Sequence, residues 1–496
     1  MRLERGAGDD APLLRVAPEP EAAPGARARA AAPRGALSAL GVAVVLFGNV
    51  AGGPFGIEPA VGAAGPLPTL VMLALAAGAW SLPQALMAAE LATMMPSNAG
   101  IVEWVLRGCG PTAGFVNAWS SVLMTLCNLP LFTLLISNAV AARAPELSRG
   151  ALYAVQVAAL AAALLVNVAG LRAVERVGGA LIVLALAPFA LLPALAAARG
   201  GARAFAWGAL GDAAPGWTGS LALSLSTVLW NQQGFNAVGN IAGEVCDARR
   251  DIPRGLTIAA VAVTLNYIVP VALTFPLAPA VADWGDGFFV TLAGRFGEAA
   301  GDATAFACVV SSLNNLISQL ALGARALQAL ARARMLAPRA AAAALAADGV
   351  RFRVPLGALL AACAVCAGLM LLSFEDLVTV ELLFSVIALC FQFAAFVALK
   401  FAAPDAPRPF AVPGGRAGAA AIASAFAALA VVVLYANLSE PGTIASGGAV
   451  LGVTVALAAA GAAWARGNSI DDVLEALRAA GAAAAEAAEA ADGAEK

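Results

Sequence analysis

Long apolar stretches separated by short charged gaps are the feature that most constrains the fold of this chain. About 20 residues of α-helix cross the hydrocarbon of a bilayer, so an apolar run of 18 or more residues predicts a membrane-crossing helix. Charged residues make up 12% of the 496 positions, which is about half the share in an ordinary soluble protein. The pattern therefore predicts an all-α polytopic membrane protein rather than a soluble one with a large core.

Twelve membrane-crossing helices can be placed along the chain. Their approximate bounds are 37–65, 67–92, 112–141, 150–169, 174–198, 218–243, 254–280, 302–330, 354–373, 376–400, 414–437 and 444–465. Residues 1–35 have no apolar periodicity and predict a disordered cytoplasmic tail. The twelve-helix domain then occupies 36–466, and 467–496 predict an Ala-rich amphipathic helix in the cytoplasm.

The placement of basic residues predicts the orientation of the chain in the membrane. Cytoplasmic loops of membrane proteins carry an excess of Lys and Arg. If the N-terminus is inside, only five of the 29 basic residues fall in exterior loops, and these are Arg143, Arg149, Arg199, Arg203 and Arg295. We therefore expect both termini in the cytoplasm. We expect the plasma membrane, and an organelle membrane stays open as the alternative.

Two features of the composition narrow the function. The chain has no histidine, which removes the commonest metal ligand and acid–base group. Neither of its lysines, Lys400 and Lys496, precedes Ser or Thr, so the phosphate-binding loop of ATPases cannot form. Basic residues lie only in short loops, which gives no support for nucleic-acid binding. We expect no enzyme activity, no cofactor and no metal site; the oligomeric state stays open.

The first expected span is interrupted. An apolar run from Gly41 to Val50 is followed by Ala51-Gly-Gly-Pro-Phe-Gly56, and the apolar pattern resumes at Ile57. Three glycines and a proline within five residues cannot sustain an α-helix, because proline lacks a donor and glycine adds backbone freedom. Backbone groups freed at membrane depth are tolerated where they line a cavity, so we expect a cavity beside this break.

The sixth expected span has a similar interruption between Trp230 and Asn240. Five carboxamide side chains and two glycines stand there in an otherwise apolar segment. An apolar core helix has no use for so many hydrogen-bonding groups. Spans one and six hold equivalent positions in two five-helix halves, and paired interruptions of this kind indicate an inverted-repeat transporter whose binding site lies at the breaks.

The two breaks together offer groups for both ends of an amino acid. Helix N-termini present N–H groups and partial positive charge that suit a carboxylate. Free carbonyls and carboxamides suit an ammonium group or a coupling cation. We therefore expect substrate-binding residues at Gly52, Gly53, Phe55, Gly56, Glu58, Asn231, Gln233, Phe235, Asn236 and Asn240.

Four side chains have more specific expected roles. Glu58 follows the first break directly and is the first candidate for an ammonium or proton site, because an ionisable residue at membrane depth is costly; a structural clasp on the outer half-helix is the alternative. Glu244 ends the sixth span, where a gate or structural role is favoured. Trp230 could form a gate or a face for an ammonium cation. Glu381 falls inside the tenth span and could face the cavity, but no motif supports it.

Several motifs resemble the amino acid–polyamine–organocation superfamily, and more narrowly its polyamine-permease branch known from plants and protozoa. The first are Gly52-Gly-Pro-Phe-Gly-Ile-Glu58 and Val61-Gly-Ala-Ala-Gly-Pro66. Four further stretches agree with them: Trp80-Ser-Leu-Pro-Gln-Ala-Leu86 to Ala89-Glu-Leu-Ala92, Ala242-Gly-Glu-Val245, Ser311-Ser312 ahead of Gln319-Leu320, and Arg408-Pro-Phe-Ala-Val-Pro413. The resemblance runs from about residue 37 to 437.

The resemblance implies the LeuT-like 5+5 inverted-repeat fold with discontinuous helices one and six, two extra C-terminal helices and alternating access. It also implies a substrate site between spans one, three, six, eight and ten. Hydroxyls in span eight of related sodium-coupled transporters hold the ion together with carbonyls of the first break. That makes Ser311 and Ser312 candidates for a coupling-ion site, while proton coupling through Glu58 stays open.

Two positions depart from the branch. Polyamine carriers that resemble this chain tend to have an acidic residue where Asn236 stands and a glutamate at the position of Ile317. A polyamine has two or more ammonium groups and requires carboxylates near both ends. A zwitterionic amino acid therefore fits the sequence at least as well as a polyamine does.

The sequence thus predicts a secondary active transporter that carries amino acids or polyamines across a bilayer, in symport with Na⁺ or H⁺. An obligatory exchanger is the alternative within the same class. A nutrient receptor that binds without transporting is a second class, and the intact glycines at both breaks argue against it. An integral membrane enzyme is a third class, which has no Ser, Cys or metal constellation inside the spans to support it.

Overall fold

The computed structural model describes residues 37–200, 205–211, 221–278, 280–285, 287–336, 339–348, 354–372, 374–439, 444–477 and 479. Within these ranges the chain is helical, with one isolated β-bridge between Leu37 and Val245. The tail expected at 1–35 lies outside the described residues. The C-terminal helix expected within 467–496 is described only in part, and residues 470–477 are helical there.

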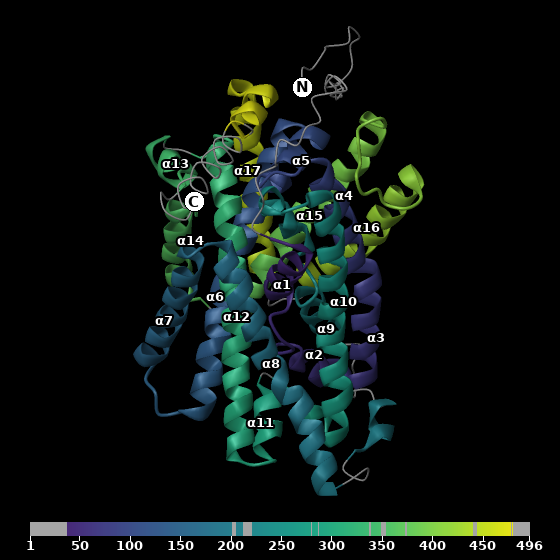
Figure 1. Cartoon of the computed structure of the whole chain (residues 1–496), viewed down its shortest axis with the longest axis vertical. Helices are drawn as coiled ribbons and strands as arrows, with labels where there is room; N and C mark the ends of the chain where they lie inside the picture. Colours follow the sequence, from purple (N-terminus) through teal and green to yellow (C-terminus); the bar gives the residue numbers. More distant parts are fainter. Residues whose placement is uncertain are drawn as a thin grey trace, which may run out of the picture.

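Nine helices in the described part are long and apolar enough to cross a membrane. Each overlaps one of the spans expected from the sequence, and Figure 1 shows them side by side in an upright bundle. They are the continuous stretch of α3 (Pro66–Ala76), η1 (Ala77–Ser81) and α4 (Leu82–Met94), then α6 (Pro111–Arg143), α7 (Arg149–Val168), α8 (Leu171–Gly200), α10 (Ala248–Thr274), α12 (Glu298–Arg332), α15 (Phe374–Ala402), α16 (Gly415–Ser439) and α17 (Ile444–Gly467).

The remaining expected spans are shorter helices. α1 (Ala39–Val50) and α14 (Leu356–Leu369) are apolar helices of 12 and 14 residues. α2 (Glu58–Ala64) continues the chain after α1, and α9 (Leu221–Trp230) is the helical part of the sixth expected span. In Figure 1, α1 lies in the middle of the bundle and α2 lies below it. The short lengths of α1, α2 and α9 follow from the two breaks, which cut a membrane-length segment into pieces.

Several short elements stand where the sequence placed no helix. They are α5 (Gly100–Cys109), α11 (Phe288–Gly294), α13 (Arg339–Ala346) and the 3-10 turns η3 (Trp207–Gly211) and η8 (Val281–Asp283), whereas the 3-10 turn η7 (Phe275–Leu277) continues the expected span after α10. All are shorter than a membrane span, so hydropathy alone gives them little signal. In α5 an ion pair between Arg107 and Glu103, 2.6 Å apart and one helical turn from each other, supports the helix.

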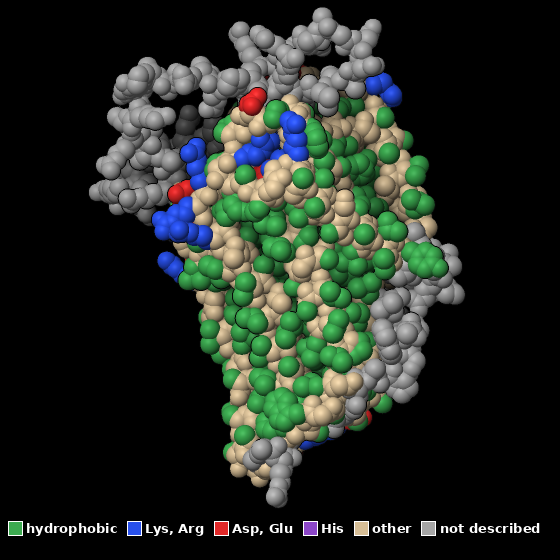
Figure 2. Space-filling view, turned by 90° about the vertical axis from the view of Figure 1, so that its right-hand side faces the viewer, with side chains coloured by type: hydrophobic (Ala, Val, Ile, Leu, Met, Phe, Trp, Pro, Cys, Tyr) green, Lys and Arg blue, Asp and Glu red, His purple; other side chains and the backbone are tan. Residues whose placement is uncertain are grey.

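Burial separates central helices from peripheral ones. In α12, 83% of the apolar window is buried inside the protein, compared with 11% in α17 and 22% in α7. α6 and α12 pack along each other, and α15 and α8 pack on them in turn. Large apolar side chains such as Leu165 and Tyr435 are exposed on the outer helices. Figure 2 shows one such face, where apolar side chains cover the middle and basic ones gather at the upper end, as expected of a lipid-facing surface.

Candidate functional site

The first break runs from Ala51 to Ile57, between α1 and α2. Gly52 and Gly56 have φ of +58° and +91°, a backbone conformation that side chains other than glycine rarely adopt. A Cβ atom on Gly52 would also lie 2.5 Å from the amide nitrogen of Asn315 and 2.7 Å from the carbonyl oxygen of Ser311. The glycines therefore let α12 approach the broken end of α1 more closely than a side chain would permit.

The second break begins after Trp230, where α9 ends. Gly234 is left-handed, with φ of +110°, and the chain continues as the 3-10 turns η5 (Phe235–Asn240) and η6 (Ala242–Glu244). The interruption predicted between Trp230 and Asn240 therefore takes the form of 3-10 turns after α9. The carboxamides of this segment bond outward to other helices, as Asn240 does to the carbonyl of Leu322 at 3.3 Å, and side chains that compete for backbone partners disfavour a regular α-helix.

The two breaks are joined by a reciprocal pair of hydrogen bonds. Asn49 at the end of α1 donates from Nδ2 to the carbonyl of Gly234 in the second break, at 3.0 Å. Asn231 in the second break donates from Nδ2 to the carbonyl of Gly56 in the first, at 3.1 Å. Each break thus satisfies a carbonyl that the other leaves free, as a low-dielectric interior requires.

Helix α12 supplies a second set of bonds to the first break. Asn315 donates from Nδ2 to the carbonyl of Ala51 at 3.2 Å, and Gln319 donates from Nε2 to the carbonyl of Asn49 at 2.8 Å. Ser311 and Ser312 lie one turn earlier on the same helix. Two carbonyls at the end of α1 therefore have carboxamide donors, which fixes the position of the break against α12.

A polar cavity lies at the junction of these elements. α1, α6, α12, α15 and both breaks contribute to its wall, and the wall combines carboxamides, hydroxyls and aromatic rings with one carboxylate. The lining residues that the following argument uses are Asn49, Phe55, Asn128, Trp230, Asn231, Gln233, Asn236, Asn240, Ser311, Ser312, Asn315 and Glu381.

The residues expected at the site divide into two groups. Eight of them line the cavity: Phe55, Trp230, Asn231, Gln233, Asn236, Asn240, Ser311 and Ser312. The other six lie outside its lining: Gly52, Gly53, Gly56, Glu58, Phe235 and Glu244. Among the second group, Phe235 is fully buried, and Gly53 makes room for the side chain of Ser311.

Glu58 lies at the first position of α2. It is 1% exposed, and its Oε2 accepts a hydrogen bond from the backbone N–H of Gly56 at 2.6 Å. A carboxylate at a helix N-terminus also interacts favourably with the helix dipole. This geometry agrees with the alternative role for Glu58, in which its carboxylate stabilises the start of the outer half-helix.

Glu381 on α15 is the acid that sequence reasoning did not select. It is 1% exposed and lines the cavity. Both of its carboxylate oxygens lie 3.0 Å from Nε2 of Gln233, which donates to them from the second break. Gln233 is oriented in turn by the hydroxyl of Ser385, which donates to its Oε1 at 2.7 Å. The available signal was an ionisable residue inside an apolar span.

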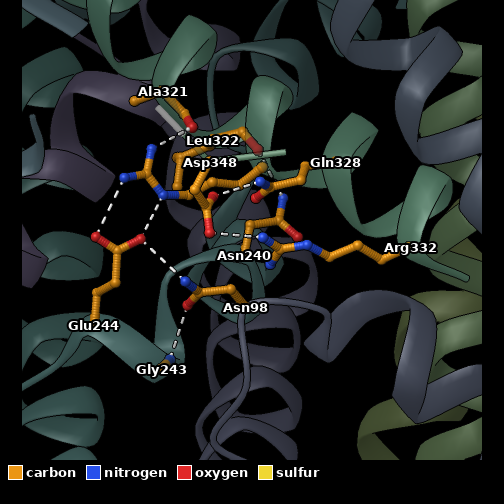
Figure 3. A network of polar contacts seen from close by, with 10 residues as sticks. Asn98, Asn240, Gly243, Glu244, Ala321, Leu322, Gln328, Arg332 and Asp348 are labelled. Carbon is orange, nitrogen blue, oxygen red and sulfur yellow. Dashed lines mark hydrogen bonds and ion pairs between the residues drawn. The ribbon is translucent and has the colours of Figure 1, made fainter. Parts of the chain in front are cut away.

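Glu244 lies in a network of polar contacts with Asn98 and Arg325 (Figure 3). Its carboxylate is 2.6 Å from Nε of Arg325 on α12 and accepts from Nδ2 of Asn98 at 3.0 Å. Asn98 also accepts from the N–H of Gly243 at 3.0 Å. The network connects the end of the second break with α12 and with the loop before α5.

A multi-pass helical membrane protein with a polar cavity between two broken helices has the construction of a membrane transporter. The chain belongs to the amino acid permease family, whose profile matches residues 37–460. It is 30% identical over 414 residues to "Polyamine transporter PUT1" of Oryza sativa subsp. japonica, covering 83% of this chain and 76% of the relative. It is also 30% identical over 386 residues to "Polyamine transporter RMV1" of Arabidopsis thaliana, covering 77% and 76%.

These comparisons confirm the resemblance to the amino acid–polyamine–organocation superfamily that the sequence motifs indicated. The relatives and the family are transporters, so the chain is a transporter and not an enzyme. The apolar helices and the family together place it in a membrane as a multi-pass protein. The cavity at the helix breaks is therefore its candidate substrate site.

Proposed function

We propose that this chain is a secondary active transporter that carries an amine-bearing solute, an amino acid or a polyamine, by alternating access coupled to a cation gradient. The observation that carries the proposal is the polar cavity where Asn49 and Asn231 join the two breaks. Carboxamides at membrane depth are costly, and their concentration in one cavity is best explained by a solute that binds there.

The twelve-helix, 5+5 inverted-repeat organisation belongs to this proposal. α1 packs against η5, whereas α2 packs against α9, so the two broken segments run past each other in opposite directions. The reciprocal bonds between the breaks are consistent with such a two-fold relation. In that arrangement one bundle rocks against the other around a fixed midplane site.

We propose that the network around Glu244 and Arg325 controls access to the cavity from the cytoplasm. We place both termini in the cytoplasm, from the distribution of Lys and Arg, and the protein in the plasma membrane. On that assignment the network closes the path from the cavity to the cytoplasm, and its ion pair breaks when the cavity opens inward. Trp230, stacked on Phe132 with ring centroids 6.0 Å apart, lies in the cavity wall and is assigned a gating or packing role.

The coupling ion is Na⁺ or H⁺. Ser311 and Ser312 remain the proposed Na⁺ ligands because both line the cavity beside the first break. The names of the relatives favour a polyamine as the solute. The zwitterionic alternative draws on the carboxamides of the second break, which can accept from an ammonium group and donate to a carboxylate.

The test is uptake into liposomes that contain the purified protein. Radiolabelled putrescine, arginine and leucine are each offered with and without an inward Na⁺ or H⁺ gradient. We expect gradient-dependent, concentrative uptake of at least one of them. Exchange from preloaded vesicles without net uptake would instead identify an obligatory exchanger. Folded protein that binds a solute but neither accumulates nor exchanges it would overturn the proposal in favour of a receptor.

A further inference from the structure

We propose that Glu381, rather than Glu58, is the carboxylate that binds the ammonium group of the solute. The inference rests on the proposed function and names the specificity-determining residue of its site. It is carried by the environment of Glu381, which is a buried carboxylate in the wall of a cavity that also holds unpaired acceptors, and which has a neutral side chain as its hydrogen-bond partner.

The first argument is charge. Two other buried glutamates are paired with cations inside the protein: Glu90 contacts Lys400 and Arg408, and Glu103 contacts Arg107. Among the described residues, the ion pairs do not include Glu381, whose hydrogen-bond partner Gln233 is neutral. A buried carboxylate is costly unless a cation pairs with it. An ammonium group in the cavity supplies that cation.

The second argument is hydrogen bonding. Oδ1 of Asn128 and Oδ1 of Asn315 are buried and have no hydrogen-bond partner in the described part of the chain. Both residues line the same cavity as Glu381. The orientation of Asn315 is set by its Nδ2, which donates to the carbonyl of Ala51. Unpaired buried acceptors require donors, and an ammonium group presents three N–H donors and no acceptor.

The third argument concerns the opposite end of a solute. Four residues between 52 and 56 have a backbone N–H, since Pro54 has none. Three of these N–H groups already donate: Gly52 to the carbonyl of Phe47, Gly53 to that of Ala51, and Gly56 to Glu58. The lining residues also include neither Lys nor Arg. The cavity is therefore better equipped for an ammonium group than for a carboxylate.

The position of Gln233 links binding at Glu381 to the conformation of the second break. An ammonium group that approaches the Glu381 carboxylate competes with Nε2 of Gln233 for the same two oxygens. Gln233 directly precedes Gly234, the left-handed residue of the break. Displacement of its side chain therefore acts on the segment that must move in alternating access.

The experiment compares Glu381→Gln and Glu381→Asp with the wild-type protein. Glu381→Gln keeps the shape and removes the charge, whereas Glu381→Asp keeps the charge on a shorter side chain. Glu175→Gln is the matched control, because it removes an acid from α8 that is outside the cavity lining. Two quantities are measured: the KM for putrescine uptake in liposomes, and the shift in melting temperature that putrescine causes in detergent.

We expect Glu381→Gln to raise the KM for putrescine at least tenfold and to abolish its thermal shift. Glu381→Asp is expected to lie between Glu381→Gln and the wild type in both the KM and the thermal shift. Glu175→Gln is expected to behave like the wild type. An unchanged KM and thermal shift in folded Glu381→Gln would overturn the inference while leaving the transporter proposal intact. Loss of gradient dependence alone, with an unchanged KM, would also overturn it, because Glu381 would then carry a coupling proton. The thermal shift measures binding of putrescine in detergent, so it tests the role of Glu381 even if the wild-type protein does not transport putrescine.

Discussion

At the scale of single residues, a chain of carboxamides explains why Asn236 stands where an acid is expected from the resemblance. Asn117 donates from Nδ2 to the carbonyl of Ile101 at 3.0 Å, so its Oδ1 accepts from Nε2 of Gln392 at 3.2 Å. Oε1 of Gln392 then accepts from Nδ2 of Asn236 at 2.9 Å. The backbone carbonyl of Ile101 can only accept, so it fixes the direction of every hydrogen bond in this series of carboxamides. Asn236 must donate, which a carboxylate cannot do.

We predict that Asn236→Asp destabilises the protein by roughly 1–3 kcal/mol, the cost of a buried acceptor left without a donor. It should not improve the affinity for putrescine, because the new charge opposes Oε1 of Gln392. The measurement is the free energy of unfolding in detergent, with the KM for uptake. The double variant Asn236→Asp with Gln392→Lys supplies donors in both directions and should recover part of the loss. A gain of stability in the single variant would contradict the assignment.

At the scale of elements, one buried ion cluster holds α4, α15 and the segment after α15 together. Glu90 on α4 is 1% exposed and lies 2.7 Å from Nζ of Lys400 and 2.9 Å from Nε of Arg408. It also accepts from the backbone N–H of Val412 at 2.8 Å. Arg408 donates to the carbonyls of Leu399 and Ala403 at the C-terminal end of α15. A cation at this end of a helix interacts favourably with the helix dipole.

Unequal effects of removing each charge follow from this geometry. Glu90→Gln leaves two buried cations without their acid and should cost about 3–5 kcal/mol. Lys400→Met leaves Glu90 with Arg408 and removes a buried ammonium group, so its effect should stay within about 1 kcal/mol. The measurement is thermal or denaturant unfolding of both purified variants. If both variants lost the same stability, Lys400 and Glu90 would form an isolated ion pair to which Arg408 adds nothing.

At the scale of the whole molecule, Glu244 connects the second break with the start of α1 and with α12. Its backbone carbonyl accepts from the N–H of Leu37 at 3.1 Å, and Leu37 accepts from the N–H of Cys246 at 2.8 Å, so the start of α1 is fixed to the end of the second break. Its side chain pairs with Arg325 on α12. A motion of α1 or of the second break relative to α12 therefore disturbs this one residue. That is the physical basis for assigning the gate to it.

We predict that Glu244→Gln opens the cytoplasmic side of the cavity. The reporter is a single cysteine at Ala326, a lining residue of α12, in a variant without the native cysteines. Labelling by a membrane-impermeant thiol reagent applied from the cytoplasmic side should become several-fold faster. Glu103→Gln is the control, because it breaks a different ion pair, which lies within α5 and has Arg107 rather than Arg325 as its cation. Unchanged labelling in Glu244→Gln would show that the network is structural and not a gate.

The sequence by itself determined the class of protein, the placement of its long apolar helices and both breaks. These features depend on local composition: an apolar run crosses a bilayer wherever it stands, and the glycines and proline at 52–56 interrupt a helix in any fold. The motifs around Glu58 and Glu244 also sufficed to indicate the family that the comparisons then confirmed.

Only the tertiary structure decided which polar side chains meet in the cavity. Glu58 stood beside the most recognisable motif, yet it accepts from Gly56 two residues away. Glu381 had no motif, yet it contacts Gln233, which is 148 residues distant in sequence. The 3-10 path of η5 was equally hidden, because the bonds from its carboxamides reach other helices. The direction of a side chain in a bundle depends on helix rotation and on distant partners, and local sequence records neither.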